Sequence, residues 1–283
     1  MFPEPIIPNN IPAESLPPLL SNWYLGSRAR RHMNMRRFSS VLSYLLNGER
    51  GRALDVGCGW GYNLFLLQWL GYEPYGIDIV QDDFYAARRV SEANDFTCNL
   101  AGADVSALPF ASNTFTAVTS VETFEHIYAA DRMRAAREIY RVLHPGGVFS
   151  LSTPNFNSLI ERGKRLLVRI PLLQRLFPPM CYPVGDLLRA DYHPYRYHQP
   201  LAVDELRALI EGVGFSIVET KTMLFTWKNT PDFLFPAIRF VEAMAESIPG
   251  IRGLGSTLVV FARKGSSPEM EPLPQERPTS IRF

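Results

Sequence analysis

The sequence predicts an α/β fold with a mostly parallel, doubly wound sheet and helices on both faces. Two observations lead to this prediction. Along residues 52–152, short apolar segments with strand character alternate with longer segments that have helical periodicity. A glycine-dense turn joins the first of these strands to the first helix. Strands that are separated by helices of this length pair in parallel, because each crossover returns the chain to the same end of the sheet.

A first set of elements leads into the alternating region and opens it. A basic amphipathic pattern over Ser27–Leu46 predicts a helix before the first strand. Gly71 ends the next helix, and Asp83 lies near the start of the one after it. In chain order we expect the strand Arg52–Val56, the helix Asn63–Leu70, the strand Tyr75–Ile79, the helix Asp82–Asn94 and the strand Phe96–Leu100.

A second set of elements completes the pattern. The pair Gly146-Gly147 predicts a turn before the fifth strand, and a long interruption follows Thr153. In chain order we expect the strand Phe115–Val121, the helix Ala130–Leu143, the strand Val148–Ser152, the helix Ala202–Gly212 and the strands Phe215–Lys221 and Ser256–Lys264.

Segments outside this pattern divide the chain. Residues 1–26 begin with a proline-rich stretch and predict an extended arm, whereas residues 265–283 mix Ser, Pro, Glu and Arg and predict a disordered tail. Residues 27–264 then form one domain. Within it, we expect residues of about 155–200 and 225–255 to be insertions at the side of the sheet where a substrate would bind, and to form a helical lid.

Composition excludes several classes of protein. A net charge of +1 argues against a nucleic-acid partner. The three scattered cysteines indicate neither a disulfide framework nor a zinc site and fit a reducing, cytoplasmic location. We find no pattern of a signal peptide and no apolar run long enough to span a membrane.

The glycine-dense turn carries the strongest functional signal. It reads Gly57-x-Gly59-x-Gly61 directly after a strand, and Asp78 follows at the end of the second strand. Such a loop permits close backbone approach, the following helix start offers N–H groups to an anionic ligand group, and the acid is placed to accept hydrogen bonds from a ribose. A dinucleotide site has a third glycine where Tyr62 stands here. The spacing therefore disfavours a nicotinamide-dependent oxidoreductase.

With Asp55 before it, this loop resembles motif I of the class I S-adenosylmethionine-dependent methyltransferases, in the ubiquinone-type or methyltransferase type 11-like group. The resemblance extends through Gly102–Phe110, Phe115–Glu122 and Glu138–Gly147, although Thr116 replaces the usual acid of the second of these segments. It implies a Rossmann-like sheet of seven strands with an antiparallel last strand, and S-adenosyl-L-methionine as the cofactor.

The resemblance also implies which residues bind this cofactor. Asp104 corresponds to the acid that hydrogen-bonds the adenine amino group, and its neighbour Val105 to the residue that packs on the ring. The complete expected set is Asp55, Gly57, Cys58, Gly59, Tyr62, Asn63, Asp78, Ile79, Asp104, Val105 and Val121.

Candidate catalytic residues lie at two places. His126 follows the fourth strand, and an imidazole there can take the proton of a hydroxyl acceptor; its alternative role is to support the loop or the cofactor pocket. His198 and Tyr197, in an aromatic and basic cluster, can contact substrate or act as base, or can simply pack. Glu122, Glu125 and His126 together could hold a divalent ion, but we predict no metal.

Residues 157–177 interleave basic and apolar side chains, and Phe233–Ile248 is a second apolar stretch. The first pattern can lie on an anionic membrane surface, which would make the protein membrane-peripheral, or can form a plain lid or a dimer contact. The oligomeric state stays open.

The sequence thus predicts a methyltransferase that acts on a small molecule, at an oxygen of a partly apolar substrate such as a quinone, lipid, glycolipid or secondary metabolite. The alternatives are a non-catalytic S-adenosylmethionine-binding module and a methyltransferase of sugar or cell-envelope precursors.

Overall fold

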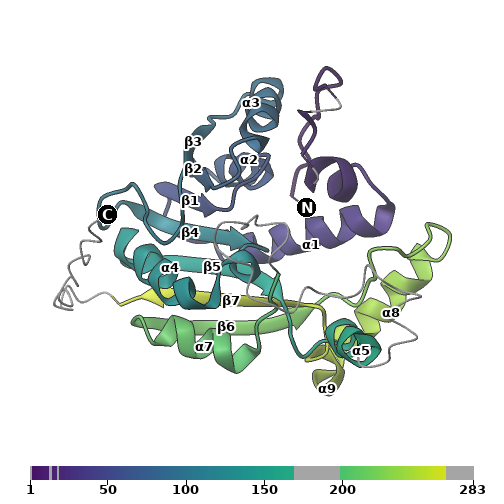
Figure 1. Cartoon of the computed structure of the whole chain (residues 1–283). Coiled ribbons are helices and arrows are strands. Elements are labelled where there is room, and N and C mark those ends of the chain that lie inside the picture. Colours follow the sequence, from purple (N-terminus) through teal and green to yellow (C-terminus); the bar gives the residue numbers. More distant parts are fainter. Residues whose placement is uncertain (1, 13–14, 18, 169–197, 266–283) are drawn as a thin grey trace, which may run out of the picture.

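The computed structural model describes residues 2–12, 15–17, 19–168 and 198–265, and places a seven-stranded sheet at its centre (Figure 1). The strand order is β3-β2-β1-β4-β5-β7-β6. β1 to β5 pair in parallel, and β7 runs antiparallel to both β5 and β6. This confirms the predicted fold. The strands are β1 (Arg52–Val56), β2 (Glu73–Asp78), β3 (Asn99–Gly102), β4 (Phe115–Val121), β5 (Leu143–Pro154), β6 (Phe215–Met223) and β7 (Thr257–Lys264).

Helices cover both faces of the sheet, and each face has its own core. α4 and α7 pack on one face around Phe149, while α1, α2 and α3 pack on the other around Tyr62. The helices are α1 (Arg28–Ser43), α2 (Tyr62–Trp69), α3 (Asp83–Asn94), α4 (Ala129–Val142), α5 (Leu159–Val168), α7 (Val203–Glu211), α8 (Phe235–Ser247) and α9 (Pro249–Arg252), with the short turns η2 (Leu19–Tyr24) and η3 (Phe124–His126).

The third strand begins at Asn99 and not at Phe96, so the predicted start was wrong. Phe96 instead closes the end of α3. Its N–H donates to the carbonyl of Ser91 at 3.2 Å, its carbonyl accepts from the Ser91 hydroxyl, and its ring is buried against α2. Asp95 at the end of α3 adopts a left-handed backbone conformation, which allows the chain to turn there. A side chain that reads as part of a strand therefore serves as a helix cap.

The expected turn at Gly146-Gly147 is also wrong, because β5 runs without interruption from Leu143 to Pro154. The residues form a bulge: Phe115 pairs with Leu143, and Ala117 pairs with Val148. Gly146 has φ of +80°, which a residue with a side chain adopts only at a cost.

The N-terminal arm is tied to the domain. Ile11, Leu20 and Tyr24 are buried in the same core as α2, and residues 19–24 form the turn η2, which the sequence did not predict. The division of the chain into arm, domain and tail stays a prediction. Most of the tail, residues 266–283, lies outside the described residues.

The two insertions meet at one end of the sheet. α5 belongs to the first insertion and α8 and α9 to the second, and Figure 1 shows all three gathered beyond the ends of β5 and β7. The N–H of Leu159 donates to the carbonyl of Leu254 at 3.2 Å and so joins the insertions. Residues 169–197 of the first insertion lie outside the described residues.

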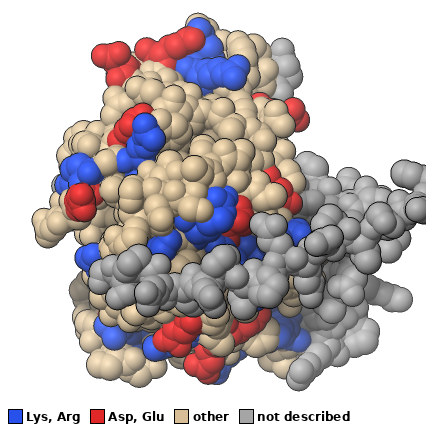
Figure 2. All heavy atoms as spheres, turned by 90° about the vertical axis from the view of Figure 1, so that its left-hand side faces the viewer, with Lys and Arg blue, Asp and Glu red and all other residues tan. Residues whose placement is uncertain are grey.

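On the face turned away from α8, basic and acidic side chains are interspersed (Figure 2). Among the helices that the structure describes, none is both long enough and apolar enough to cross a membrane.

Candidate active site

The glycine loop lies between β1 and α2, and its backbone requires glycine. Gly57, Gly59 and Gly61 have φ of +76°, +46° and +83°. A Cβ on Gly57 would lie 2.2 Å from Oγ1 of Thr123, in the loop after β4. The N–H groups of Gly57 and Cys58 donate to the carbonyl of Ile77 at 2.8 and 3.0 Å. The loop is thus held against β2 and the end of β4.

Asp78 ends β2 and faces this loop. Its Oδ2 accepts a hydrogen bond from the Gly59 N–H at 2.9 Å, and its Oδ1 accepts one from the Val80 N–H at 2.9 Å. Burial raises the pKa of Asp78, and the hydrogen bonds from the N–H groups of Val80 and Gly59 oppose that rise. Ile79 follows with 48% of its side chain exposed. The loop and this acid form a single polar edge with an apolar side chain beside it.

Asp55 lies beneath the loop and is fully buried. Its Oδ1 accepts hydrogen bonds from Asn63 Nδ2 at 2.7 Å and from Thr119 Oγ1 at 2.8 Å. Burial raises the pKa of Asp55 to about 7. This network joins β1, α2 and β4, and sequence reasoning missed Thr119. Asn63 Oδ1 is buried without a hydrogen-bond donor among the described residues, so an acceptor remains at the start of α2.

Three further predicted residues pack around the loop. Tyr62 is buried among Trp60 and Phe38, and its hydroxyl donates to Met35 Sδ at 3.0 Å. The thiol of Cys58 is buried, and a Cβ on Gly76 would lie 2.7 Å from its Sγ. Val121 ends β4, half-buried, against the core beneath α1. The contacts of Tyr62 and Cys58 support the loop from within the protein, whereas Val121 belongs to the neighbouring core.

Asp104 and Val105 follow β3. Asp104 is exposed and its Oδ1 accepts a hydrogen bond from the Ser106 N–H at 2.8 Å, which closes a short turn. Val105 is buried in the core under α4. The turn lies at the same edge of the sheet as Asp78, because Ala103 N–H donates to the Asp78 carbonyl at 3.2 Å.

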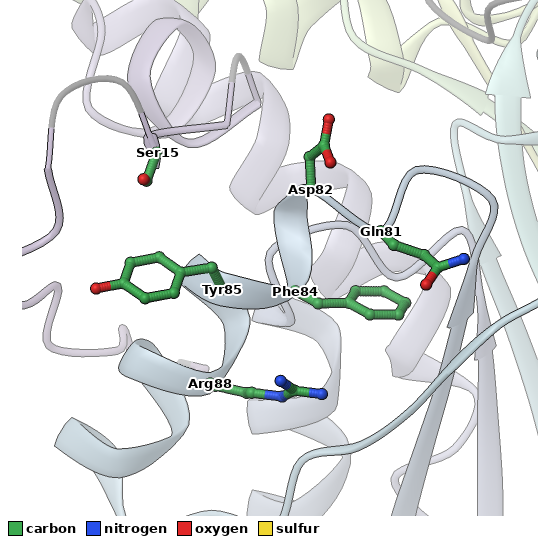
Figure 3. Close-up of a pocket in the computed structure, with 6 residues that line it drawn as sticks. All are labelled: Ser15, Gln81, Asp82, Phe84, Tyr85 and Arg88. Carbon is green, nitrogen blue, oxygen red and sulfur yellow. The ribbon is translucent and has the colours of Figure 1, made fainter.

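An open hollow of about 550 Å³ lies next to this edge (Figure 3). The first turn of α3 forms one wall and Ser15 of the arm the other, and its lining residues are Ser15, Gln81, Asp82, Phe84, Tyr85 and Arg88. Gln81 also covers Gly102, where a Cβ would lie 2.3 Å from Gln81 Nε2. The hollow therefore lies on the α3 side of the loop that carries Asp78.

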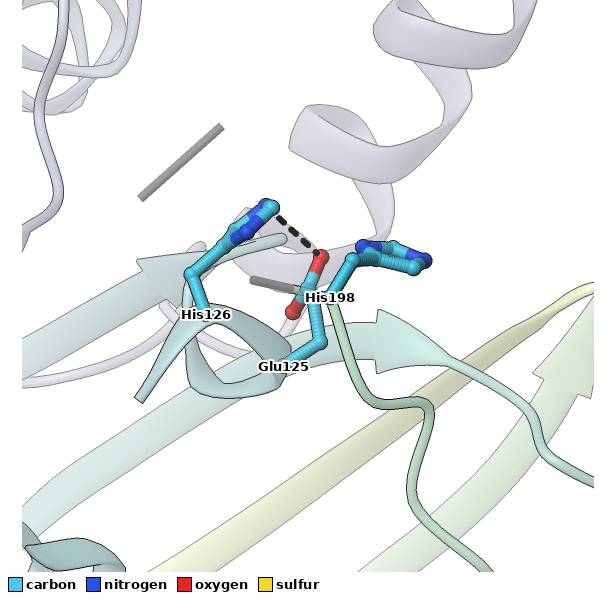
Figure 4. Close-up of side chains that lie close together, drawn as sticks. All are labelled: Glu125, His126 and His198. Carbon is cyan, nitrogen blue, oxygen red and sulfur yellow. Dashed lines mark ion pairs between the residues drawn. The ribbon is translucent and has the colours of Figure 1, made fainter. Parts of the chain in front are cut away.

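A second cluster combines Glu125, His126 and His198 (Figure 4). Glu125 and His126 come from η3, and His198 comes from the segment before α7. Nε2 of His126 lies 3.8 Å from Oε1 of Glu125, and the two imidazole rings lie 5.2 Å apart. Within the described parts of the chain, one ligand atom from each of the three residues lies within 4.8 Å of the others.

The backbone beside His198 is held by residues distant in sequence. Gln199 N–H donates to the Glu125 carbonyl at 2.9 Å. The buried guanidinium of Arg132 donates to the carbonyls of Gln199 and Ile127, each at 3.1 Å. Arg132 is therefore a positioning residue that sequence reasoning missed, since only its place in a helix pattern was visible.

Glu122 belongs to a different contact from the one that the sequence suggested. Its Oε2 lies 3.0 Å from Nη2 of Arg37 in α1, and its Oε1 accepts a hydrogen bond from Ser152 at 2.9 Å. The sequence suggested that Glu122, Glu125 and His126 could hold an ion together. In the structure, His198 takes the place of Glu122 in this group. Arg37 was not predicted, because nothing local marks one arginine of a basic helix as the partner of a distant acid.

Charges around the cluster determine its protonation. Burial, reinforced by the charge of Glu122, raises the pKa of Glu125 well above its usual range, while Thr153 Oγ1 donates to it at 3.0 Å. Burial, together with the positive charges of His126, Lys164, Arg37 and Lys228, lowers the pKa of His198 to about 3. These surroundings favour the protonated form of Glu125 and leave His198 neutral at neutral pH. Tyr197 lies outside the described residues.

Comparison with known proteins places this geometry in a family. The profile of the methyltransferase domain matches residues 54–151. The chain is 32% identical over 176 residues to a demethylmenaquinone methyltransferase of Thermus thermophilus. The matched region covers 59% of this chain and 74% of the relative. It is 28% identical over 188 residues to a ubiquinone biosynthesis O-methyltransferase of Cereibacter sphaeroides, covering 66% and 69%.

A solved structure shows the same fold. It is an S-adenosylmethionine-dependent methyltransferase of Thermotoga maritima, with a TM-score of 0.57 and 17% sequence identity, and the match covers 86% of this chain and 93% of that one. The sheet order, the domain match and the relatives agree with one another, and they establish both the enzyme class and its methyl donor, S-adenosyl-L-methionine. The chain belongs to the class I S-adenosylmethionine-dependent methyltransferases.

Proposed function

We propose that this enzyme methylates an oxygen of a partly apolar small molecule, and that His126 is the base that takes the proton of the acceptor hydroxyl. The observation that carries this proposal is the cluster of Glu125, His126 and His198 beside the glycine loop. The names of two relatives, which refer to demethylmenaquinone and to O-methylation in ubiquinone biosynthesis, support a quinone-like acceptor.

The loop and the ends of β2 and β3 are the proposed donor site. The turn at Gly57–Gly61 brings backbone close to a ligand, the fixed carboxylate of Asp78 suits the ribose hydroxyls, and exposed Ile79 suits the face of the adenine. Asp104 is exposed at the same edge and suits the adenine amino group. These residues fit S-adenosylmethionine, which supplies a methyl group already activated by its sulfonium and releases it with the C–S electron pair remaining on sulfur.

The acceptor side needs one proton transfer. As the acceptor oxygen bonds to the methyl carbon, its proton passes to a ring nitrogen of His126. Such a base contributes about 10² to 10⁴ in rate when it is correctly placed. His126 is only partly buried, and its charge acts on Asp78 of the proposed donor site. This proximity to Asp78 supports a place for His126 beside the proposed donor site.

His198 and Glu125 have supporting roles in this proposal. A pKa of about 3 makes His198 a poor proton acceptor, but its ring packs 5.2 Å from that of His126 and limits its orientation. Glu125 lies 3.8 Å from His126, and burial favours its protonated form. It can ionise when the imidazole gains its proton, because each charge then stabilises the other.

The test is direct identification of the methylated atom. The intact chain is incubated with S-adenosylmethionine labelled in its methyl group and with three acceptor sets: quinols, lipid extract and sugar precursors. We expect label on a hydroxyl oxygen of an apolar acceptor, identified by mass spectrometry. Label on carbon or nitrogen would reject His126 as a hydroxyl base, and label on sugars would reject the acceptor class.

A further inference from the structure

Helix α8 packs with its polar side inward. Glu242 is buried and Glu246 is half-buried, whereas Phe240, Val241 and Met244 face outward. A helix on the surface of a soluble protein normally has the opposite arrangement, with its apolar stripe on the core. Two things need an explanation: what the buried acids contact on the inner side of α8, and what the exposed apolar side chains meet on its outer side.

On the inner side, the two acids are fully engaged. Glu242 accepts hydrogen bonds from Thr226 Oγ1 at 2.7 Å and from the N–H groups of Phe225 and Thr226, and its Oε1 lies 2.7 Å from Nε2 of His32. Glu246 pairs with Arg36 at 2.7 Å. These contacts hold α8 on α1 and on the chain after β6, so the orientation of the helix is fixed.

On the outer side, apolar side chains continue beyond the helix. The side chains are 81% exposed for Phe233, 68% for Phe240 and 52% for Met244. We call the set the α8 face, and it consists of Phe233, Phe240, Val241, Met244, Ile248 and Ile251. Exposed apolar side chains that gather on one element are typical of a surface that meets a partner. Leu159 and Leu166 of the adjoining α5 are also exposed.

On α5, α8 and α9, the charged side chains that are exposed are all basic. The acids of α5, α8 and α9 are Glu161, Glu242 and Glu246, and each is ion-paired. Arg162, Arg239 and Arg252 are exposed. Exposed arginines therefore border the apolar side chains of these helices, in contrast to the mixed charges on the opposite face of the protein (Figure 2).

We propose that the α8 face docks the protein on the surface of an anionic membrane. Side chains such as Phe240 and Met244 enter the boundary between headgroups and acyl chains, and the arginines lie among the anionic headgroups. A second copy of the chain fits less well, because a two-fold contact sets each face against itself and brings arginine toward arginine. This proposal does not depend on which atom the enzyme methylates.

The docking surface differs from the one that the sequence suggested in residues 157–177. Within the described residues of that segment, Lys164 pairs with Glu161 at 2.7 Å and its charge acts on His198, so it belongs to the acceptor side. Arg169 and Arg175 lie outside the described residues. The larger apolar surface is on α8, between β6 and β7.

The test is flotation of the whole chain with lipid vesicles. We expect binding to vesicles of equal parts phosphatidylglycerol and phosphatidylcholine, and little binding to phosphatidylcholine alone. The double variant Phe240→Ser/Met244→Ser should bind at least ten-fold more weakly, and Arg239→Gln about five-fold more weakly. Both changes are at exposed positions, so binding of S-adenosylmethionine, measured by calorimetry, should stay as in the unchanged protein.

Two matched variants control for exposed apolar surface in general. Trp69→Ser on α2 and Val218→Ser on β6 remove exposed apolar side chains far along the chain from α8, and each should leave vesicle binding unchanged. The proposal is overturned if the unchanged protein does not float with anionic vesicles, or if the double variant floats equally well. It is also overturned if sedimentation shows a dimer that the double variant abolishes, because a second copy then occupies the face.

Discussion

The proposed donor and acceptor sites lie at the same edge of one sheet but are built in different ways. On the donor side, Gly59 and Asp78 meet through a hydrogen bond from the backbone, and the loops that carry them directly follow neighbouring strands. On the acceptor side, His198 reaches His126 from the end of a long insertion, and Arg37 reaches Glu122 from the helix before the sheet.

This difference explains how one fold can keep its donor and vary its acceptor. Strand pairing and short turns determine the donor side, so it changes only if the sheet changes. The acceptor side depends on side chains from insertions that can vary without altering strand order. The predictions below test this contrast, starting with the one that should have the largest effect.

Replacing Gly57 with valine should abolish binding of S-adenosylmethionine. The backbone there has φ of +76°, and the new Cβ would lie 2.2 Å from Thr123 Oγ1, so the turn after β1 must open. We expect affinity to fall at least 100-fold in calorimetric titration, with a lower melting temperature. Gly163→Ala is the control, because a Cβ there meets nothing within 4 Å. Micromolar affinity in the Gly57 variant would show that the loop does not bind the donor.

The sequence predicted the backbone arrangement of the proposed donor side because its signals are local. The strand-turn-helix pattern located Gly57, Gly59 and Asp78, and the structure brings them together as expected. Errors arose where backbone and side chains compete: Phe96 caps a helix, and the residues at Gly146 enter a strand as a bulge. A periodicity pattern contains no information on such alternatives.

The acceptor side was predicted only in part because its contacts are long-range. His126 and His198 were identified as separate candidates, but nothing in the sequence indicated that they meet. Arg132, which holds the backbone at Gln199, looked like any arginine of a helix. Similarly, Phe233–Ile248 was visible as an apolar stretch, but its outward direction depends on the partners that Glu242 finds in the folded protein.

The next largest effect should come from His126→Ala. If His126 is the hydroxyl base, kcat should fall by about 10² to 10⁴, while the affinity for S-adenosylmethionine stays within two-fold or so, because Asp78 and the loop are unchanged. Steady-state kinetics together with titration of the donor separate these two quantities. His144→Ala, at an exposed position on β5, is the matched control. An unchanged kcat would leave His126 as a support for the loop.

A smaller effect concerns the docking of α8 on α1. Burial raises the pKa of Glu242, but hydrogen bonds from His32, Thr226 and two backbone N–H groups outweigh burial and bring it to about 2, below the usual 4.5. A depressed pKa means that the stabilisation is complete above pH 4.5 and is lost as the pH falls toward 2. It corresponds to about 3 kcal/mol by linkage.

Urea denaturation at several pH values measures this contribution. Glu242→Gln should be less stable than the unchanged protein at pH 6, and the difference should shrink steadily below pH 4.5. Glu219→Gln, at an exposed position on β6, should alter stability little at any pH. A constant difference for Glu242→Gln between pH 6 and pH 3 would mean that the carboxylate is not what holds α8.

The smallest effect that we expect is that of metal removal, which should leave the rate unchanged. Glu125, His126 and His198 have the geometry to bind a divalent cation, but their surroundings disfavour one. Burial and the charge of Glu122 raise the pKa of Glu125, which favours its protonated form, and burial together with nearby positive charges lowers the pKa of His198. A cation would have to compete with a proton for Glu125 and would be repelled by the positive side chains that act on His198. Dialysis against a chelator, followed by kinetics with and without added Mg²⁺ or Zn²⁺, decides the point. If activity were lost and then restored by one of these ions, the acceptor hydroxyl would be activated by the metal, and His126 would be its ligand and not the base.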